Sequence, residues 1–318
     1  MPPSPPFNVL LVEDNPGDAL LTRALLDGAA PGGMFRVTHV ERLGDAVTHL
    51  ARDGSDVVLL DLGLPDAFGV EAVSGLLDVA PDLPLVVLSG HDDERLALEA
   101  VLRGAQDYLI KGRSDRALMR RAIRYAIERK RAERRLHFLA KHDPLTGLAN
   151  RVLFQDRIVQ ALRRLGDGRD RLIGLIFIDL DGFKPVNDRY GHEVGDMLLR
   201  AVAKRLIGAV RRTDTVARMG GDEFTVILEG LHRRADAVRV AEKVLATLAT
   251  PFDVSGTEIT VSASLGVALA ERADEDADSL IRRADAAMYQ AKAGGGHRFE
   301  LHDGPAAFGL PPARRAVA

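Results

Sequence analysis

The chain has 318 residues, the length of about two ordinary domains, and 46% of them are hydrophobic, enough for each domain to bury a core. A formal net charge of −3 gives no general attraction to nucleic acid or to an anionic membrane surface, and the lack of cysteine excludes disulfides and thiolate metal sites. No stretch approaches the roughly 18 uninterrupted apolar residues of a membrane span, and the proline-rich start lacks a signal-peptide pattern, so we expect a cytoplasmic protein.

The first third of the chain alternates between strand-like and helix-like segments. Residues 1–6 form a proline-rich tail that we expect to be disordered. We then expect strands at 9–12, 35–40, 57–60, 85–88 and 108–110, and helices at about 19–26, 45–52, 70–79 and 93–103. Such alternation predicts a five-stranded parallel sheet with helices on both faces, and sites in these sheets form at the carboxyl ends of the strands.

Polar residues stand at those strand ends: Glu13, Asp14, Asp61, Ser89 and Lys111. Carboxylates bind a hard cation such as Mg²⁺, while a lysine and a hydroxyl contact phosphate oxygens. Taken singly, Glu13 and Ser89 are better explained as residues that merely end a strand. Taken together, the five predict a site for a cation and a phosphoryl group.

With the run 57–66 and Tyr108, these residues resemble a response-regulator receiver domain over residues 7–125. The resemblance implies a flavodoxin-like fold in which Asp61 accepts a phosphoryl group from a cognate histidine kinase. The residues that it assigns are Glu13, Asp14, Asp61 and Gly63 at the Mg²⁺ ion, Ser89 and Lys111 at the phosphoryl group, and Tyr108 as the aromatic switch.

No glycine or proline interrupts residues 114–141, which predicts one long helix with Ser114 or Asp115 as its cap. Residues spaced alternately four and three apart along it match a coiled-coil seam. The seam positions are Leu118, Ala122, Tyr125, Arg129, Ala132, Leu136 and Leu139. Up to residue 125, packing on the receiver's own sheet explains the stripe better. We therefore expect a coiled-coil linker at 126–141.

The second half of the chain contains two segments that carry acids. Residues 172–178 are an apolar run of strand length, and Asp179 follows them. Further on, Gly220 and Gly221 predict a hairpin turn, because a tight primed turn needs positive φ at both central positions. Asp222 and Glu223 would then lie just past a tip without side chains.

At such a tip a bulky anion can come close to the backbone, and the adjacent carboxylates can hold its divalent ion. A nucleoside triphosphate meets both conditions. A surface hairpin with two solvated acids explains the hairpin alone equally well, because Gly-Gly turns are common.

Several segments, taken in order, resemble a GGDEF diguanylate cyclase domain over residues 142–300. They are D-P-L-T-G-L-A-N-R at 143–151, I-D-L-D-G-F-K at 178–184, N-D at 187–188, G-H at 191–192 and G-G-D-E-F at 220–224. The resemblance implies an α/β fold like that of nucleotidyl cyclases and polymerase palms, with a mainly antiparallel sheet. It also implies conversion of two GTP to cyclic di-GMP with Mg²⁺ or Mn²⁺, in a homodimer whose two active sites face each other.

The resemblance also assigns the site residues of this half. They are Asp179, the Leu180 carbonyl and Asp222 at the metal; Asp222, Glu223 and Lys184 in catalysis; Asn187 and Asp196 at the guanine; and Gly220, Gly221, Lys292 and Arg298 elsewhere on the substrate. We expect Phe183 to be a core residue, and Asp196 to cap a helix that opens at Gly195. The chain departs from the family at Gly296, where a phosphate-contacting arginine is usual, and Arg298 stands two residues later.

Arg211 and Asp214 match the R-x-x-D motif of the family's inhibitory site, at which cyclic di-GMP is the allosteric inhibitor. An exposed charge pair at a helix end is the plainer explanation. The register of the motif against Gly220 favours the inhibitory site.

The sequence therefore predicts a two-component response regulator whose diguanylate cyclase output depends on phosphorylation of Asp61, followed by a C-terminal tail at 301–318. The alternative is a GGDEF module that binds GTP or cyclic di-GMP without turnover, which Gly296 alone favours. A receiver-driven DNA-binding regulator would need a recognition helix, and the sequence offers none.

Overall fold

A computed structural model of the chain describes residues 6–26, 34–90, 94–166, 172–272 and 275–302. Most of the two expected tails, residues 1–5 and 303–318, therefore lies outside the described residues. The chain divides into two compact units, residues 1–137 and 138–318.

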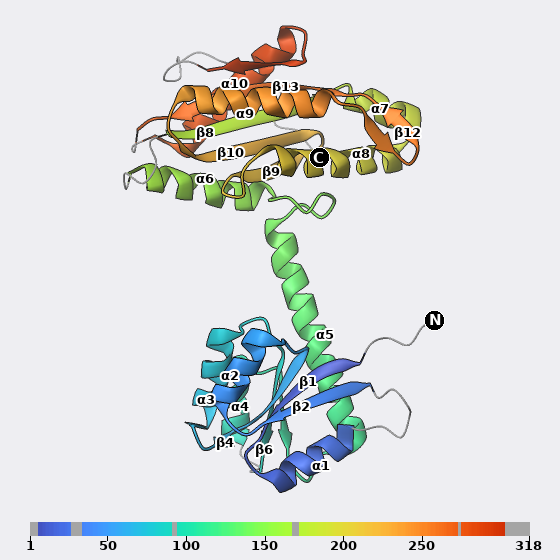
Figure 1. The fold of residues 1–318 in the computed structure, drawn as a ribbon, viewed down its shortest axis with the longest axis vertical. Helices are drawn as coiled ribbons and strands as arrows, with labels where there is room; N and C mark the ends of the chain where they lie inside the picture. The colour runs from blue at the N-terminus through green and yellow to red at the C-terminus, as the bar shows by residue number, and fades with distance from the viewer. Residues whose placement is uncertain (1–5, 27–33, 91–93, 167–171, 273–274, 303–318) are drawn as a thin grey trace. The chain divides into compact units, whose positions relative to one another are not determined.

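The first unit is built on a parallel sheet in the order β2-β1-β3-β6-β7 (Figure 1). Its strands are β1 (Phe7–Val12), β2 (Phe35–Val40), β3 (Val57–Asp61), β6 (Leu85–Ser89) and β7 (Asp107–Ile110). A short hairpin, β4 (Gly63–Leu64) and β5 (Ala67–Phe68), follows β3. The connecting helices are α1 (Pro16–Leu26), α2 (Leu43–Arg52), α3 (Val70–Val79) and α4 (Glu94–Leu102).

Helices cover both faces of this sheet, and every residue of β3 is buried, because a parallel sheet excludes water on both sides. One face packs on α1 and on the first half of α5 (Arg116–Lys141), and the other face packs on α2, α3 and α4. The predicted sheet, its order of elements and the long helix are confirmed.

The long helix α5 begins after Asp115, whose Oδ1 accepts the backbone N–H of Leu118 at 2.7 Å. Asp115 is thus the cap, while Ser114 donates to the carbonyl of Ile110 instead. The buried stripe of α5 is Met119, Ala122, Ile123, Ala126 and Ile127.

That stripe differs from the predicted seam, which shares only Ala122 with it. The reason is that the residues that pack into the receiver core are spaced three and four apart starting at Met119, which places them on a different face of the helix. The apolar seam side chains Tyr125, Leu136 and Leu139 are exposed to 66%, 67% and 37%.

The second unit is built on a sheet in the order β14-β13-β8-β10-β9. Its strands are β8 (Leu172–Asp181), β9 (Thr215–Gly220), β10 (Glu223–Leu231), β13 (Ser262–Ala270) and β14 (Arg298–Leu301). Only β13 and β14 pair in parallel among these described strands, so the predicted mainly antiparallel sheet is confirmed.

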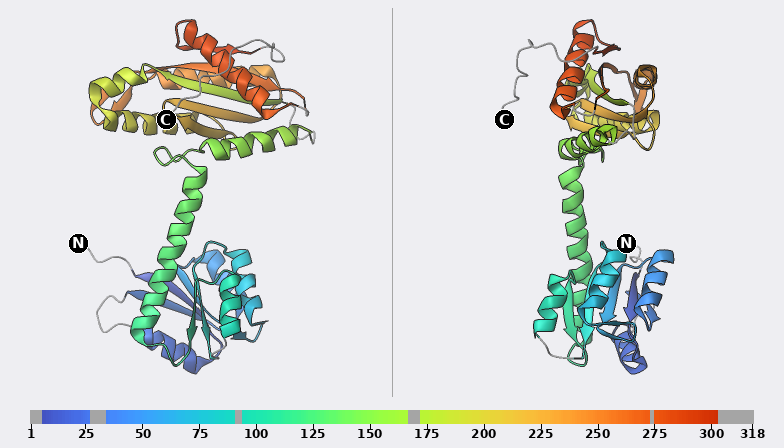
Figure 2. Two further views of the ribbon diagram at one scale, coloured as in Figure 1. Left: turned by 180° about the vertical axis from the view of Figure 1, so that it is seen from behind. Right: turned by 90° about the vertical axis from the view of Figure 1, so that its left-hand side faces the viewer.

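Two helix layers enclose this sheet (Figure 2). One face packs on α6 (Arg151–Gly166) and α10 (Ala277–Ala293), and the other on α8 (His192–Ala209) and α9 (Arg234–Ala249). Helix α7 (Phe183–Tyr190) and the hairpin of β11 (Phe252–Val254) and β12 (Thr257–Ile259) complete the unit. Gly266 lets α10 come very close to β13, because a Cβ there would lie 2.0 Å from the carbonyl oxygen of Ala284.

Candidate active site and receiver site

The hairpin tip between β9 and β10 differs from the prediction. Gly220 pairs with Glu223, and the register shifts between Glu223 and Phe224, so the two turn residues are Gly221 and Asp222. Gly220 and Gly221 do have positive φ angles, of 143° and 54°. The glycines therefore supply the expected backbone conformation, but Asp222 lies in the turn itself and not beyond it.

The central strand β8 brings a second acid to this tip. Asp179 pairs directly with Glu223 across the two strands, and directly opposed residues project on the same face of a sheet. The backbone N–H of Leu180 donates to the carbonyl of Asp222 at 3.3 Å. From α10, which covers this face, the Nζ of Lys292 reaches the Oδ1 of Asp179 at 2.7 Å. The structure thus brings together Asp179, Asp222, Glu223 and Lys292.

Burial and the crowding of acids disfavour the charged forms of Asp179 and Glu223. The pKa of Asp179 is raised, first by burial and then by Asp222 and Asp181, although Lys292 opposes the shift. The pKa of Glu223 is raised by burial, and next by Asp179 and Asp285. Burial would lower the pKa of Lys292, but its hydrogen bond to Asp179 and the nearby acids raise it. A divalent cation would relieve this repulsion, although Asp179, Asp222 and Glu223 do not all lie within 4.8 Å of one another.

Asp285 is a neighbour of this site that the sequence analysis missed. It lies on α10, and burial raises the pKa of its carboxyl. Asp285 lies next to the buried stripe that contains Ala284 and Ala287, and no local signal in the sequence distinguishes it.

Helix α7 holds two of the predicted residues. Lys184 is exposed in its first turn, and Asn187 packs against α8 at Gly195, where a Cβ would lie 1.8 Å from the Oδ1 of Asn187. This buried Oδ1 has no hydrogen-bond partner among the described residues.

The predicted cap of α8 is wrong. The N-cap is Gly191, and Gly195 and Asp196 lie inside the helix. Gly191 has a φ of 86°, which ends α7 and starts α8 in one residue, a conformation that favours glycine. Asp196 is exposed.

The segment after α10 is arranged around Asp181, which the sequence analysis did not assign. Its carboxylate accepts the hydroxyls of Ser262 and Ser264 at 3.0 and 2.7 Å and the backbone N–H of His297 at 3.0 Å. Gly296 has a φ of 72°, and a Cβ there would lie 2.8 Å from Asp181. The contact with Asp181 thus explains why glycine occupies this position.

Arg298 is the first residue of the edge strand β14, and its side chain is 51% exposed. Its Nη1 lies 3.8 Å from the Oε1 of Glu300. The structure shows no contact between Arg298 and the four residues Asp179, Asp222, Glu223 and Lys292. Its assignment to the substrate stays a prediction.

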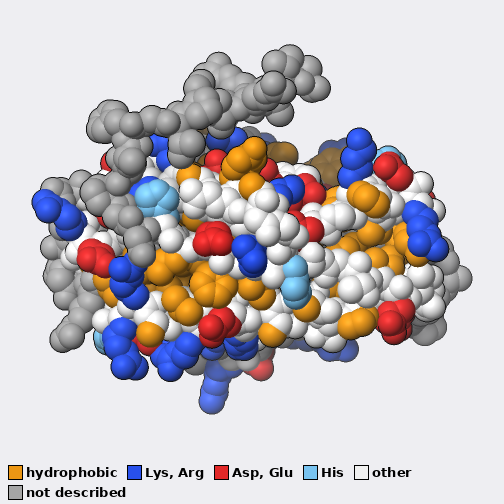
Figure 3. Space-filling view, turned by 90° about the horizontal axis from the view of Figure 1, so that it is seen from above, with side chains coloured by type: hydrophobic (Ala, Val, Ile, Leu, Met, Phe, Trp, Pro, Cys, Tyr) orange, Lys and Arg blue, Asp and Glu red, His pale blue; other side chains and the backbone are white. Residues whose placement is uncertain are grey.

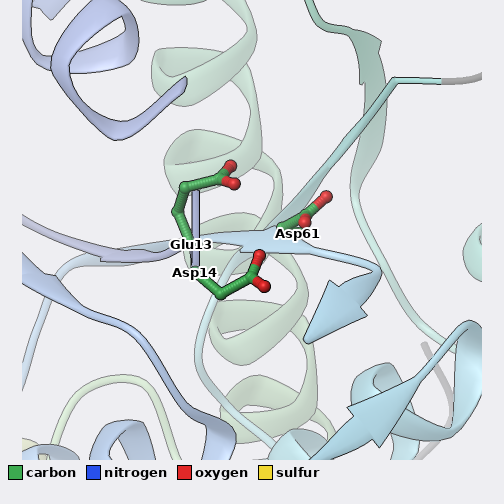
Figure 4. Close-up of side chains that lie close together, drawn as sticks. All are labelled: Glu13, Asp14 and Asp61. Atoms are coloured by element: carbon green, nitrogen blue, oxygen red, sulfur yellow. The ribbon is translucent and has the colours of Figure 1, made fainter. Parts of the chain in front are cut away.

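The receiver residues meet at the carboxyl ends of β1 and β3. The carboxylates of Glu13, Asp14 and Asp61 lie within 4.8 Å of one another around one space (Figure 4). Within the described part of the chain, no other group of three such side chains is found. Three carboxylates at this spacing suit a hard cation such as Mg²⁺.

Lys111 forms ion pairs with two of these acids, Glu13 and Asp61. Its Nζ lies 3.0 Å from Asp61, 2.6 Å from Glu13 and 3.1 Å from Asp18, a residue that the sequence analysis did not include. Burial would lower the pKa of Lys111, but its hydrogen bonds to Glu13 and Asp61 raise it. The pKa of Glu13 is raised by burial, against the effect of Lys111.

The other predicted receiver residues lie on the neighbouring strands and on the hairpin after β3. Ser89 is buried at the end of β6, and Tyr108 is half-buried in β7, where it packs on the α2–α4 side of the core. A Cβ at Gly63 would lie 3.3 Å from the Oδ2 of Asp61, so glycine lets the backbone come close to that carboxylate.

Arg211 and Asp214 line a groove of about 330 Å³ together with Glu229, Asp236 and Arg239. The carboxylate of Asp214 accepts the backbone N–H groups of Arg211 at 2.8 Å and of Glu229 at 3.3 Å. Its pKa is nevertheless raised by burial. The Asp214 carboxylate therefore fixes the backbone of the loop 211–214 through these hydrogen bonds. The Arg211 side chain is exposed.

On the face drawn in Figure 3, acidic and basic side chains are interspersed, and hydrophobic side chains gather between them. The described residues of this face therefore present no broad field of one sign. None of the described helices is long and apolar enough to cross a membrane.

Comparison with known families agrees with this geometry. The family "Diguanylate cyclase, GGDEF domain" matches residues 140–298, and the family "Response regulator receiver domain" matches residues 9–123. The chain belongs to the GGDEF family and carries a receiver domain before the GGDEF domain.

Two curated relatives illustrate the two parts. The diguanylate cyclase TpbB of Pseudomonas aeruginosa is 45% identical over 169 residues, which are 52% of this chain and 38% of TpbB. The response regulator PleD of Caulobacter vibrioides is 31% identical over 299 residues, 90% of this chain and 64% of PleD. The chain thus spans less than two thirds of the length of these relatives.

Among solved structures, the coiled coil and GGDEF domain of DgcB from Caulobacter crescentus, in complex with c-di-GMP, is similar to this chain. The TM-score is 0.50 at 29% identity, and the match covers 58% of this chain and 99% of that one. This similarity supports the fold of the second unit.

The contact between Gly296 and Asp181 leads to a testable expectation. We expect Gly296→Arg and Gly296→Ala each to destabilise the chain by about 1–2 kcal/mol, because any Cβ meets Asp181 at a positive φ. Thermal unfolding of the full chain would measure this. Gly208→Ala on α8, where a Cβ meets open space, is the matched control and should not destabilise. Unfolding of Gly296→Arg at the wild-type temperature would contradict the constraint.

Proposed function

We propose that the chain is a two-component response regulator with diguanylate cyclase output, in which two GTP are joined to cyclic di-GMP with release of two pyrophosphates. The observation that carries the proposal is the convergence of Asp179, Glu223 and Lys292 on one face of the central strands, with Asp222 in the adjacent turn. We assign residues 7–125 to the receiver, 126–141 to the linker and 142–300 to the cyclase.

The proposed chemistry follows from these side chains. Asp222, in the turn, takes the proton of the attacking ribose 3′-hydroxyl as general base, with Glu223 as a further acid beside it. Lys292 and the exposed Lys184 contact the phosphates. A divalent ion, Mg²⁺ or Mn²⁺, held by Asp179, the Leu180 carbonyl and Asp222 would neutralise charge on the reacting phosphate.

Guanine recognition is assigned to Asn187 and Asp196. The packing of Asn187 against Gly195 supports this assignment, because it brings Asn187 on α7 close to the turn of α8 that carries Asp196. One domain holds one GTP, so two copies of the chain have to face each other for the 3′-hydroxyl of each to reach the other nucleotide. The homodimer is therefore part of the proposed active site.

Regulation is proposed at two places. Asp61 accepts the phosphoryl group from a histidine kinase, with Mg²⁺ at Glu13, Asp14, Asp61 and Gly63. Lys111 and Ser89 contact the phosphoryl oxygens, and Tyr108 responds as the switch. Cyclic di-GMP binds as inhibitor at Arg211 and Asp214, where an arginine fork can hold guanine or phosphate.

Substitution of the acids tests the cyclase. We expect Asp222→Ala and Asp179→Ala each to lower cyclic di-GMP formation at least about a hundredfold without unfolding the chain, because they remove the base and a metal ligand. Product analysis after incubation with GTP and Mg²⁺ would measure this. Glu258→Gln, an exposed acid on β12, is the control. Near wild-type turnover by Asp222→Ala would contradict the catalytic assignment, and GTP binding without turnover by the wild type would favour the receptor alternative.

Product inhibition gives a second expectation. Arg211→Ala should leave the initial rate unchanged and make turnover insensitive to added cyclic di-GMP, because the Arg211 backbone N–H still holds the Asp214 loop. Initial rates at rising product concentration would show it. Arg282→Ala, an exposed arginine on α10, should keep the wild-type sensitivity. Equal inhibition of Arg211→Ala and the wild type would remove this motif from the proposal.

Phosphoryl control gives the third expectation. Beryllofluoride, which mimics the phosphoryl group at Asp61, should tighten the dimer and raise the cyclase rate, because turning of Tyr108 alters the surface next to α5. Leu136→Asp with Leu139→Asp should abolish the stimulation, since both exposed leucines lie on the proposed seam.

Sedimentation and turnover would be measured side by side. A control with Arg135→Ser and His137→Ser alters the same stretch off the seam and should still respond. A double-leucine variant that remained responsive to beryllofluoride would show that the signal does not pass through this helix.

A further inference from the structure

The side chain of Arg218 joins two distant parts of the second unit. Its Nε and Nη2 both donate to the carbonyl of Gly221, at 3.0 and 2.7 Å. Its Nη1 donates to both carboxylate oxygens of Asp143, at 3.1 and 3.2 Å. The Arg218 and Asp143 side chains are only 11% and 18% exposed. Charge-assisted hydrogen bonds with so little access to water are much stronger than surface ion pairs.

At the hairpin, this arginine fixes the turn that carries Asp222. The carbonyl of Gly221 belongs to the same planar peptide unit as the N–H of Asp222, so holding the oxygen sets the direction of the whole unit. On the other side, the carbonyl of Asp222 accepts the N–H of Leu180. Asp222 is therefore held on both sides, by the hydrogen bonds of Arg218 to the Gly221 carbonyl and by the hydrogen bond from Leu180 to its own carbonyl. Without Arg218, the turn could rotate about the remaining hydrogen bond to Leu180.

At the other end, Asp143 lies in a compact turn directly after α5. Its Oδ1 accepts the backbone N–H and the hydroxyl of Thr146 at 2.9 and 2.6 Å, and its own N–H donates to the carbonyl of Leu148 at 2.8 Å. The hydrogen bonds from Thr146 and Arg218 lower the pKa of Asp143 in spite of its burial. The carboxylate is thus held in its charged form, facing Arg218.

Asn150 fastens this turn to two helices. Its Nδ2 donates to the carbonyl of Ala140 in the last turn of α5 at 3.0 Å, and its Oδ1 accepts the N–H groups of Val152 and Leu153 at the start of α6, both at 3.0 Å. The backbone N–H of Asn150 also donates to the carbonyl of Lys141 at 2.9 Å. The C-terminal turn of α5 is therefore bonded to the segment that positions Asp143.

A backbone contact runs beside the side-chain contact. Ala149 bridges to Ala217 in parallel, and the N–H of Arg218 donates to the carbonyl of Ala149 at 2.9 Å. The segment 143–150 thus lies along the edge strand β9. A displacement of this segment would reach Arg218 through both its main chain and its side chain.

We propose that Asp143 and Arg218 are positioning residues that hold the hairpin tip carrying Asp222 and connect its position to the last turn of α5. The catalytic part of this inference rests on the proposed cyclase function. The proposal gives the motif at 143–151 a role in positioning the hairpin tip, in addition to connecting α5 to α6.

The test uses the full chain and compares Asp143→Asn, Arg218→Lys and the double variant. Asparagine at position 143 can still accept the hydrogen bonds from Thr146, so this variant keeps the turn and loses only the negative charge. Lysine at position 218 keeps the positive charge but lacks the planar set of N–H donors that contacts Gly221 and Asp143 together. We expect each single variant to lower kcat for GTP turnover about tenfold with KM changed less than twofold, and the double variant to be no slower than the slower single variant.

A second measurement does not depend on activity. Hydrogen exchange of the peptide that contains residues 220–224 should be about tenfold faster in both single variants, because the Gly221–Asp222 turn loses its anchor. Thr146→Val is the matched control. It weakens the same turn but leaves the Asp143–Arg218 pair, so exchange at the tip should stay at the wild-type rate.

The connection to α5 is tested by Asn150→Ala. It should speed exchange at the tip in the wild-type background and have no further effect in the Asp143→Asn background, because both act through one chain of contacts. Asp276→Ala removes the comparable cap of α10 and should leave the tip unchanged.

Several results would overturn the proposal. They are wild-type exchange at the tip in Asp143→Asn, a faster tip with unchanged kcat, and additive effects of Asn150→Ala and Asp143→Asn. An inactive wild type would instead contradict the proposed function, and the exchange measurements would still decide whether the tip is held through Asp143 and Arg218.

Discussion

The antiparallel register of β8 against β10 is the constraint on which the second unit depends. It places Asp179 opposite Glu223, and it sets the hydrogen bond between Leu180 and the turn residue Asp222. A slip of one residue would turn Asp179 toward the core formed with α8 and α9. The side chains of both cores resist that slip, because the shift would exchange Ile176 and Ile178 with Leu175 and Phe177 between two faces that pack on different helices.

This register has an electrostatic cost. Asp179, Glu223 and Asp285 share a partly buried face, and burial together with mutual repulsion raises the pKa of Asp179 and Glu223. Lys292 offsets part of the repulsion by its hydrogen bond to Asp179. Clusters of acids with raised pKa values are more typical of functional sites than of residues that only stabilise the fold.

The two units collect distant acids by different geometric means. In the first, parallel strands end at one edge of the sheet, so Glu13, Asp14 and Asp61 meet because each lies at the end of a strand or directly after it. In the second, the acids meet because residues pair directly across antiparallel strands. The first arrangement follows from the order of elements alone, whereas the second requires the register to be known.

The sequence by itself determined the class of both folds, the strand and helix order of the first unit and the identity of most candidate residues, because apolar periodicity and short motifs are local properties. It did not determine that Asp222 lies in the turn, since the register shift next to Phe224 arises from pairing with β9. Nor did it show that Gly191 begins α8, or that the receiver core takes the Met119 face of α5.

Only the tertiary structure revealed Asp285 beside Glu223, Asp181 beneath Gly296, and the contact between Asp143 and Arg218, which are 75 residues apart. Such contacts depend on strand register and on which face of a helix turns toward the sheet. Both are set by the packing of the whole unit, and no local pattern of residues encodes them.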